Sequence, residues 1–289
     1  MRAPARPDSI IAVRSRPSVQ DILNTTGHRP TPLPKRHWSV TQRWNDLLFA
    51  HWPVPASSIA SLLPAGLVPD TFDGSAWIGV VPFWMDRIRF RAIPRIPGMD
   101  TFPELNLRTY VREEGTNLAG VYFFSLDAAN PFAVMTARAL FRLPYFWAHM
   151  AIQPQQEGRF FYRSDRHLAK RPARFRATYR GLGPTRRLAQ SAPGTIEYFL
   201  TERYRLYTAD HRGHLFQGDI HHLPWPLEAA EAEIHINELP AAHGIKLPET
   251  QPLLFYAREM VVYIWSIELA KGLGAALAAR RPVPAVEPL

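Results

Sequence analysis

The chain of 289 residues has 46% hydrophobic and 12% aromatic side chains, which excludes wholesale disorder and supports a substantial core. It has no cysteine, which excludes disulfides, thiolate nucleophiles and cysteine-ligated zinc or iron–sulfur sites. A formal net charge of +9 suggests nucleic acid as a partner, but the arginines that supply most of it are scattered, so we expect a preference for anionic ligands or a solvated basic surface and no nucleic acid.

Residues 1–38 are rich in proline, arginine and serine and lack a sustained hydrophobic period. This pattern predicts a flexible N-terminal arm with a short helix at SVQDILN (18–24). The first residues contain no apolar segment of a secretory signal, and no run reaches the roughly 18 apolar residues of a membrane span. We therefore expect a cytoplasmic protein without a membrane partner.

Residues 39–270 form one predicted domain, without a Gly/Ser linker or an internal repeat. Short β-type runs fill it, separated by Pro, Gly, Asp or Asn, at 43–52, 76–84, 105–111, 119–128, 145–151, 159–165, 174–180, 202–208, 214–222 and 260–267. Short helices are predicted at 57–64, 130–144 and 192–201, the clearest of them with Asn130 as N-cap and Pro131 in its first turn. The arrangement predicts a mainly β (α+β) fold, either a barrel or a sandwich. Residues 271–289 are predicted to be a C-terminal tail with room for a short helix.

The stretch FPELNLRTYV (102–111) alternates between two faces, as a strand does. One face is apolar apart from a threonine. The other carries an acid, an amide, a guanidinium and a phenol, which are Glu104, Asn106, Arg108 and Tyr110. Such a face is either a wet outer surface or the lining of a pocket, and the alternation alone does not distinguish the two.

Several segments resemble the uncharacterised YqjF-like family, also called the domain-of-unknown-function 2071 family. They are WNDLLFAHWPVP, LLPAGLVPDTFDGSAWIGVVPFWM, ELNLRTYV, GVYFFSLDA, ARALFRLPY, LTERY and HHLPWPLEAA, in this order over about residues 40 to 268. That family is placed in the acetoacetate decarboxylase superfamily. The resemblance therefore implies an acetoacetate decarboxylase-like antiparallel β-barrel, cone-shaped, with a central pocket and a few short helices.

The resemblance also implies that the polar face points inward. In acetoacetate decarboxylases the equivalent strand carries a glutamate that faces the cavity, and Glu104 stands at that place. A buried carboxylate needs partners, and Arg108 and Arg138 are the expected counter-ions. We assign Glu104 as a general acid/base, and Arg108, Arg138, Asn106 and Tyr110 as substrate-binding residues.

The Schiff-base chemistry of the decarboxylases is not expected, because it needs a lysine of lowered pKa. The family's lysine pair follows the proline after the helix, where this chain reads Pro144, Tyr145 and Phe146. The four lysines, Lys35, Lys170, Lys246 and Lys271, all lie elsewhere. Tyr145 takes the position of the lost nucleophile, either as a proton donor or as a packed aromatic residue.

Two further groups of residues carry polar chemistry. His51, His221 and His222 are the histidines to test as metal ligands together with Glu104. Adjacent residues of a strand point to opposite faces, so His221 and His222 cannot both bind one metal from a regular strand, and the sequence has no H-E-x-x-H spacing. We therefore expect no metal and no cofactor. The segment LTERY (200–204) repeats the Glu-Arg-Tyr set, either as a second polar lining or as a charged helix end.

Three functions stay open. The first is a lyase or isomerase that acts on a small anionic oxo-acid without a Schiff-base lysine, with Glu104 and Tyr145 in catalytic roles. The second is a non-catalytic carrier or sensor of a small anionic or aromatic organic ligand. The third is a structural protein with a filled barrel, and a homo-oligomer is compatible with all three. A pocket of roughly 300 Å³ or more beside Glu104, Arg108 and Tyr145 favours the first two.

Overall fold

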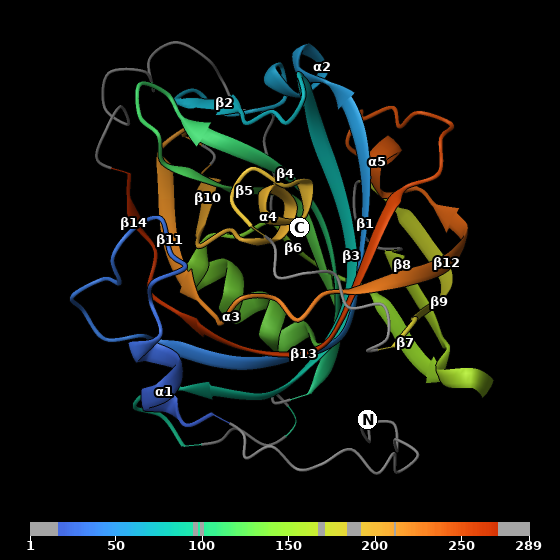
Figure 1. Cartoon of the computed structure of the whole chain (residues 1–289), viewed down its shortest axis with the longest axis horizontal. Coiled ribbons are helices and arrows are strands. Elements are labelled where there is room, and N and C mark those ends of the chain that lie inside the picture. Colours follow the sequence, from blue (N-terminus) through green and yellow to red (C-terminus); the bar gives the residue numbers. More distant parts are fainter. Residues whose placement is uncertain are drawn as a thin grey trace.

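A closed ring of strands forms the body of the protein, whose computed structural model describes residues 17–94, 98, 101–166, 171–183, 192–210 and 212–270. The ring strands are β1 (Val40–Pro55), β3 (Ser75–Phe90), β4 (Phe102–Glu113), β5 (Ala119–Ala128), β10 (Arg205–Ala209), β11 (Leu215–His221) and β13 (Leu253–Ile264). Their order is β11–β10–β5–β4–β3–β1–β13, and β13 pairs back to β11 at Ile220↔Ile264, which closes the ring (Figure 1).

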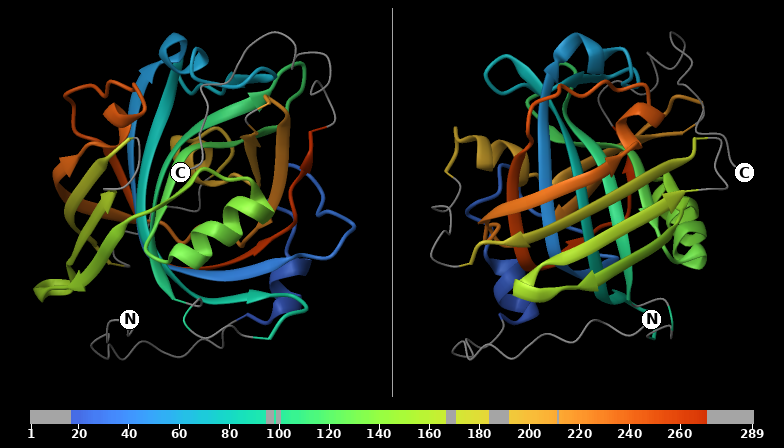
Figure 2. Two further views of the ribbon diagram at one scale, coloured as in Figure 1. Left: turned by 180° about the vertical axis from the view of Figure 1, so that it is seen from behind. Right: turned by 90° about the vertical axis from the view of Figure 1, so that its right-hand side faces the viewer.

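A second sheet continues from β13 and covers one side of the ring. Its strands are β12 (Glu228–Asn237), β9 (Ala173–Gly181), β8 (Phe160–Arg166) and β7 (His149–Pro154). Figure 2 shows these strands crossing β1 and β3 at an angle. Successive strand residues face opposite sides, so Leu48 packs toward this sheet and its Tyr162, whereas Leu47 and Phe49 pack inside the ring.

Short helices and short strands lie around the ring and the second sheet. They are α1 (Val19–Asn24), α2 (Ala56–Ala60), α3 (Pro131–Phe141), α4 (Ile196–Thr201) and α5 (Leu239–Ala242), with a 3₁₀ turn at Gln156–Gly158 and the short strands β2 (Leu67–Pro69), β6 (Tyr145–Trp147) and β14 (Glu268–Leu269). The predicted start of α3 is confirmed, because Asn130 Oδ1 accepts hydrogen bonds from the main-chain N–H groups of Phe132 and Ala133 and Pro131 is the first helical residue.

The mainly β prediction is confirmed, but the ring is not antiparallel throughout. β5 pairs in parallel with both β6 and β10. The strand predicted at 145–151 is two strands interrupted at Ala148, and the one predicted at 202–208 begins only at Arg205, after α4. Strand β12 was not predicted, because its sequence EAAEAEIHIN combines alanines and charges that have low β-propensity.

Part of the predicted N-terminal arm packs against the ring. Ile22 is only 3% exposed and packs against Tyr263 and Trp265. The main-chain oxygen of Ile22 lies 2.8 Å from Nε2 of His221, and Arg29 donates to the Ile220 oxygen over 2.6 Å. The flexible-arm expectation is therefore wrong for these residues. Residues 1–16 and 271–289 lie outside the described residues, and the domain boundaries near 39 and 270 stay predictions.

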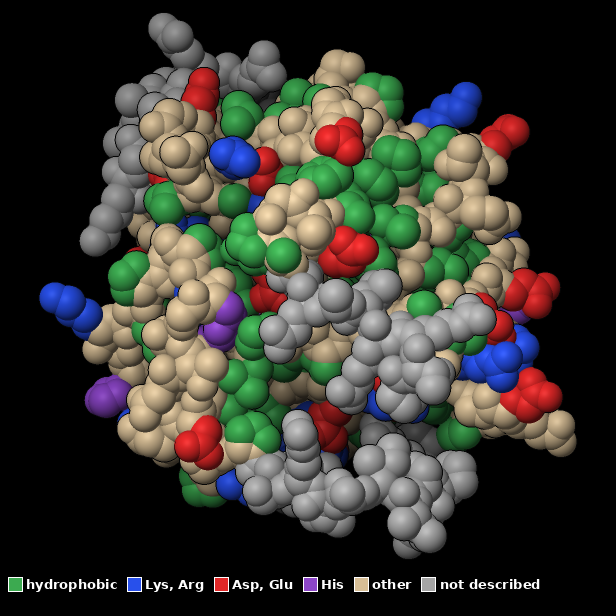
Figure 3. Space-filling model, viewed as in Figure 1, with side chains coloured by type: hydrophobic (Ala, Val, Ile, Leu, Met, Phe, Trp, Pro, Cys, Tyr) green, Lys and Arg blue, Asp and Glu red, His purple; other side chains and the backbone are tan. Residues whose placement is uncertain are grey.

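The three arginines of β9 each pair with a carboxylate of a neighbouring segment. Arg174 pairs with Glu238, Arg176 pairs with Asp165, and Arg180 pairs with Glu231. On the face drawn in Figure 3, the basic side chains are scattered among acidic and apolar ones. Within the described part of the chain, no helix is both long enough and apolar enough to cross a membrane.

Candidate functional site

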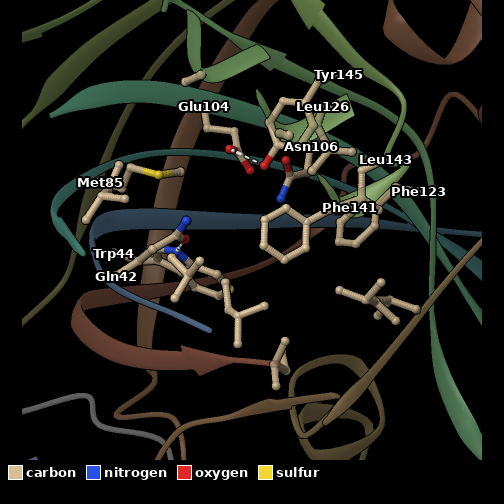
Figure 4. A pocket seen from close by; sticks show the side chains of 18 of the residues that line it. Gln42, Trp44, Met85, Glu104, Asn106, Phe123, Leu126, Phe141, Leu143 and Tyr145 are labelled. Atoms are coloured by element: carbon tan, nitrogen blue, oxygen red, sulfur yellow. Dashed lines mark hydrogen bonds between the residues drawn. The ribbon is translucent and has the colours of Figure 1, made fainter. Parts of the chain in front are cut away.

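A cavity of about 120 Å³ lies inside the ring, with α3 at one end and the end of α4 at the other. Most of its walls are apolar or aromatic, and they include Trp44, Met85, Phe123, Leu126, Phe141 and Leu143 (Figure 4). The cavity is smaller than the roughly 300 Å³ typical of drug-sized ligands. It is close in size to an apolar cavity of about 150 Å³ that binds benzene, so it suits a ligand of a few heavy atoms.

The polar face of β4 points into this cavity. Glu104, Asn106 and Arg108 all line it, whereas Leu105 and Leu107 on the opposite face pack toward the second sheet. The face is therefore an internal lining and not a wet surface.

Tyr110 continues the same face but does not line the cavity. Its hydroxyl donates to the Leu200 oxygen over 2.8 Å and so ties β4 to α4. Its expected role in substrate binding is corrected to a contact that holds the end of the ring.

Glu104 and Tyr145 form the central polar contact of the cavity. The Tyr145 hydroxyl donates to Glu104 Oε2 over 2.9 Å, and Figure 4 shows the two side chains pointing toward each other. Burial raises the pKa of Glu104 to about 8; hydrogen bonds from Tyr145 and Asn106 oppose this rise, and the charge of Asp127 adds to it. Burial also holds the pKa of Tyr145 well above its usual value, so the phenol stays a donor. Glu104 is therefore mostly an uncharged acid at pH 7.

The expected counter-ions do not reach Glu104. Arg108 donates to the Tyr110 hydroxyl and to the Leu200 oxygen, both over 3.2 Å. Four residues along a strand correspond to roughly 13 Å between Cα atoms, which separates the Arg108 guanidinium from the carboxyl group. Among the described residues, no ion pair includes Glu104.

Arg138 bonds to the main chain of Tyr145 and does not line the cavity. Its Nε donates to the main-chain oxygen of Tyr145 over 2.7 Å, and its guanidinium lies 5.7 Å from the Phe146 ring centroid. The parallel pairing of β6 with β5, at Leu126↔Tyr145, brings the tyrosine to the cavity wall. The assignment of Arg138 to substrate binding is therefore replaced by a role in holding Tyr145.

The LTERY segment contributes to the site more than its sequence indicated. Thr201 and Arg203 line the cavity, and Tyr204 is buried, with its hydroxyl bonded to Glu202. Arg203 NH1 lies 2.6 Å from Oδ2 of Asp70, so its charge is compensated. Trp225 also lines the cavity and was not predicted; the LTERY repeat was the only sequence signal that could have located Arg203.

The candidate histidine ligands have separate hydrogen-bond partners. His51 Nε2 is 2.7 Å from the Tyr110 hydroxyl, and His222, which lines the cavity, has Nδ1 2.7 Å from the Leu223 oxygen. Burial lowers the pKa of His222 to about 3 and that of His221 to about 4. The described residues contain no group of three or more His, Asp or Glu side chains suited to a metal. The described residues therefore do not place these histidines and Glu104 together as one group of metal ligands.

No described lysine lines the cavity. Lys35 and Lys246 are exposed, and Lys170 and Lys271 lie outside the described residues. In the described part of the chain, the site therefore offers an acid and a phenol where a Schiff-base enzyme needs an amine.

The comparison with known families identifies the chain. The domain-of-unknown-function 2071 family, described as an uncharacterized conserved protein, matches residues 41–261. The uncharacterized protein YqjF of Bacillus subtilis (strain 168) is 48% identical over 240 residues, which cover 81% of this chain and 94% of YqjF. The chain belongs to this YqjF-like family.

Solved structures give this YqjF-like protein its fold class. The enduracididine biosynthesis enzyme MppR complexed with pyruvate matches with a TM-score of 0.55 and 13% identity, over 81% of this chain and 91% of MppR. An acetoacetate decarboxylase-like enzyme from Sphingomonas wittichii RW1 matches with a TM-score of 0.55 and 13% identity, over 84% and 97% of the two chains. The acetoacetate decarboxylase-like fold is thereby confirmed, and at such low identity the likeness extends to the fold alone.

Proposed function

We propose that this cavity is an active site in which Glu104 and Tyr145 move a proton on a small anionic oxo-acid, in a reaction of the lyase or isomerase type without a Schiff base. The observation that carries the proposal is the hydrogen bond between the half-buried Tyr145 and the buried Glu104 at the wall of a cavity. A structural ion-pair network would give Glu104 a cationic partner, and the described residues provide none.

The pKa of Glu104 supports a role in proton transfer. A general acid or base works best when its pKa lies near the working pH, and a pKa of about 8 meets that condition. The ionised form takes a proton from the carbon beside the carbonyl group. The electron pair of the broken C–H bond then forms the enolate, whose oxygen accepts a hydrogen bond from Tyr145. The protonated Glu104 returns the proton to the same or another carbon.

The size and charge of the cavity support a small oxo-acid. About 120 Å³ admits a few heavy atoms, and Arg108 provides positive charge at the wall. MppR, which shares the fold, has been solved in complex with pyruvate and with the condensation product of pyruvate and imidazole 4-carboxaldehyde. A carboxylate-bearing carbonyl compound fits the same features here.

A carrier or sensor role is the second candidate. The predominance of apolar and aromatic walls favours it, because such walls hold an aromatic ligand without any chemistry. In that case Glu104 only donates a hydrogen bond to the ligand. At about 120 Å³ the cavity falls short of the roughly 300 Å³ expected of a ligand site, so a structural protein with a largely filled barrel stays the third candidate.

Hydrogen–deuterium exchange separates these functions. The protein is incubated in D₂O with pyruvate, acetoacetate and 4-oxopentanoate, and exchange at the carbon beside the carbonyl is followed by NMR. We expect catalysed exchange that is lost in Glu104→Gln and retained in Glu113→Gln, which removes another buried carboxyl group of β4 outside the cavity. Ligand binding without any exchange would indicate the carrier or sensor, and neither binding nor exchange would contradict both.

A further inference from the structure

Two buried N–H groups of the cavity have no hydrogen-bond partner in the protein. They are Nε of Arg108 and Nε1 of Trp225, and both side chains line the cavity. Both lie against Phe49: the Arg108 guanidinium carbon is 5.5 Å from its ring centroid, and the Trp225 ring centroid is 5.0 Å away in an edge-to-face contact. Unpaired buried donors are uncommon and costly, so two of them beside one ring point to a bound acceptor.

Arg108 is also the uncompensated cation of the cavity. Its described hydrogen bonds go to neutral acceptors, the Tyr110 hydroxyl and the Leu200 oxygen. Arg203, the other arginine at the cavity wall, is matched by Asp70. In the described part of the chain, no carboxylate pairs with Arg108, so its half-buried positive charge favours an anion.

Trp44 is the other tryptophan that lines the cavity, and its indole N–H has a hydrogen-bond acceptor. Nε1 of Trp44 donates to Oε1 of Gln42 over 2.8 Å, within the wall itself. Trp225 has its main-chain N–H bonded to Glu202 over 2.9 Å, but its indole N–H is left without a protein acceptor. The unpaired donor is therefore a property of this position and not of cavity tryptophans in general.

We infer that Arg108 and Trp225 form an anion subsite that holds the carboxylate of the ligand. One uncompensated positive charge matches a monoanion, and two N–H donors match the two oxygens of a carboxylate. A phosphate group, with more charge and three bare oxygens, would need more donors than this wall offers. The inference rests on the proposed function in taking this cavity as the ligand site, and it adds which end of the ligand binds where.

The position of the subsite constrains the ligand. Arg108 lies four residues from Glu104 on the same face of β4, and their Cα atoms are roughly 13 Å apart. A ligand that touches both groups carries its carboxylate at one end and its reacting carbon at the other. We therefore assign the ligand to the linear oxo-carboxylates.

The test compares each acid with its neutral amide. Pyruvate, acetoacetate, 4-oxopentanoate and the three corresponding amides are titrated calorimetrically into wild-type protein and into Arg108→Gln, Trp225→Phe and Trp77→Phe. Trp77→Phe is the matched control, because Nε1 of Trp77 is also buried without a partner but its side chain does not line the cavity. A hydrogen bond to a charged group contributes about 1.5–3 kcal/mol, which corresponds to a change in Kd of about tenfold or more.

We expect at least one acid to bind about tenfold more tightly than its amide in wild type and in Trp77→Phe, and we expect this preference to shrink in Trp225→Phe and in Arg108→Gln. If Arg108→Gln does not fold, Trp225→Phe decides the question alone. Equal affinities for every acid and its amide, no binding of any probe, or a full preference in Trp225→Phe would overturn the subsite.

Glu104→Gln separates this inference from the proposed function. The subsite requires that the preference for the acid persists in this variant. The proposed function requires that proton exchange is lost in it. A preference that persists while wild type shows no exchange would support the subsite and contradict the proposed chemistry. A preference that disappears in Glu104→Gln would contradict the subsite.

Discussion

The hydroxyl of Tyr145 donates a hydrogen bond to Oε2 of Glu104 across 2.9 Å, although 41 positions separate the two residues in the chain. β6 carries the phenol and β4 carries the carboxyl group, and β5 lies between these strands in the sheet. Burial raises the pKa of Glu104 to about 8, and the hydrogen bond from Tyr145, a neutral donor, opposes this rise only in part.

Removal of the Glu104 charge should change how stability depends on pH. The folded-state pKa of about 8 lies above the usual 4.5, so between these values the folded protein binds more protons than the unfolded chain. The free energy of unfolding therefore falls as pH rises through this window, by at most about 1.4 kcal/mol per pH unit from this group. Denaturant melts of Glu104→Gln should lack this decline.

His221 and His222 add a slope of the opposite sign, because the unfolded chain loses their protons around pH 6.5 whereas burial keeps them neutral in the folded protein, but this slope is common to wild type and Glu104→Gln and cancels in their difference. Glu113→Gln serves as the control, because Glu113 is also buried on β4 but lies outside the cavity. A parallel decline in wild type and Glu104→Gln would show that the Glu104 carboxyl group is not desolvated.

Tyr145→Phe should raise the pKa of Glu104 further. The phenol hydrogen bond stabilises the carboxylate form, so its loss favours the acid form. Carbon-13 NMR of labelled Glu104 should show a titration midpoint above the wild-type value, and any catalysed exchange should need a higher pH. Tyr162→Phe is the control, because the Tyr162 hydroxyl donates to the main-chain oxygen of Glu104 over 2.6 Å and not to its carboxyl group. Equal midpoints in wild type and Tyr145→Phe would rule out the coupling.

The two arginines that share Asp70 should differ in their importance to stability. Arg203 is 8% exposed in its side chain and Arg112 is 45% exposed. Arg203→Met removes a buried partner and should cost about 3 kcal/mol, the lower end of the range for buried pairs because Arg112 still faces the carboxylate. Arg112→Met should cost about 0–1 kcal/mol, since a largely exposed pair is screened by water. Similar losses in urea melts would contradict the difference in burial.

The packing of the N-terminal segment can be measured with two residues of α1. Ile22 is 3% exposed, whereas Val19 is 51% exposed. Ile22→Ala should destabilise the protein by about 2 kcal/mol, because it leaves a cavity against Tyr263 and Trp265. Val19→Ala should stay within about 0.5 kcal/mol. If both variants melt like wild type, residues around α1 do not contribute to the folded body.

Local signals in the sequence determined which residues share a face and where the main elements begin. The period of two placed Glu104, Asn106 and Arg108 together, because successive strand residues alternate regardless of the surrounding fold. The Asn130-Pro131 pair marked the start of α3 for an equally local reason, since a side-chain acceptor and a fixed φ act within one turn. The sequence also shows directly that the family's lysine pair is replaced, because Tyr145 and Phe146 follow Pro144.

Only the tertiary structure decided which partners these residues have. Whether the polar face of β4 is inside depends on closure of the ring by β11 and β13, which are more than a hundred residues further along the chain. Sheet register then placed the phenol of Tyr145, and not a guanidinium, beside Glu104. The contacts of Arg108 and Trp225 with Phe49 likewise join three separate parts of the chain. Hydrogen bonds and charges act over a few ångströms, so their partners follow from distances that residue spacing along one strand does not contain.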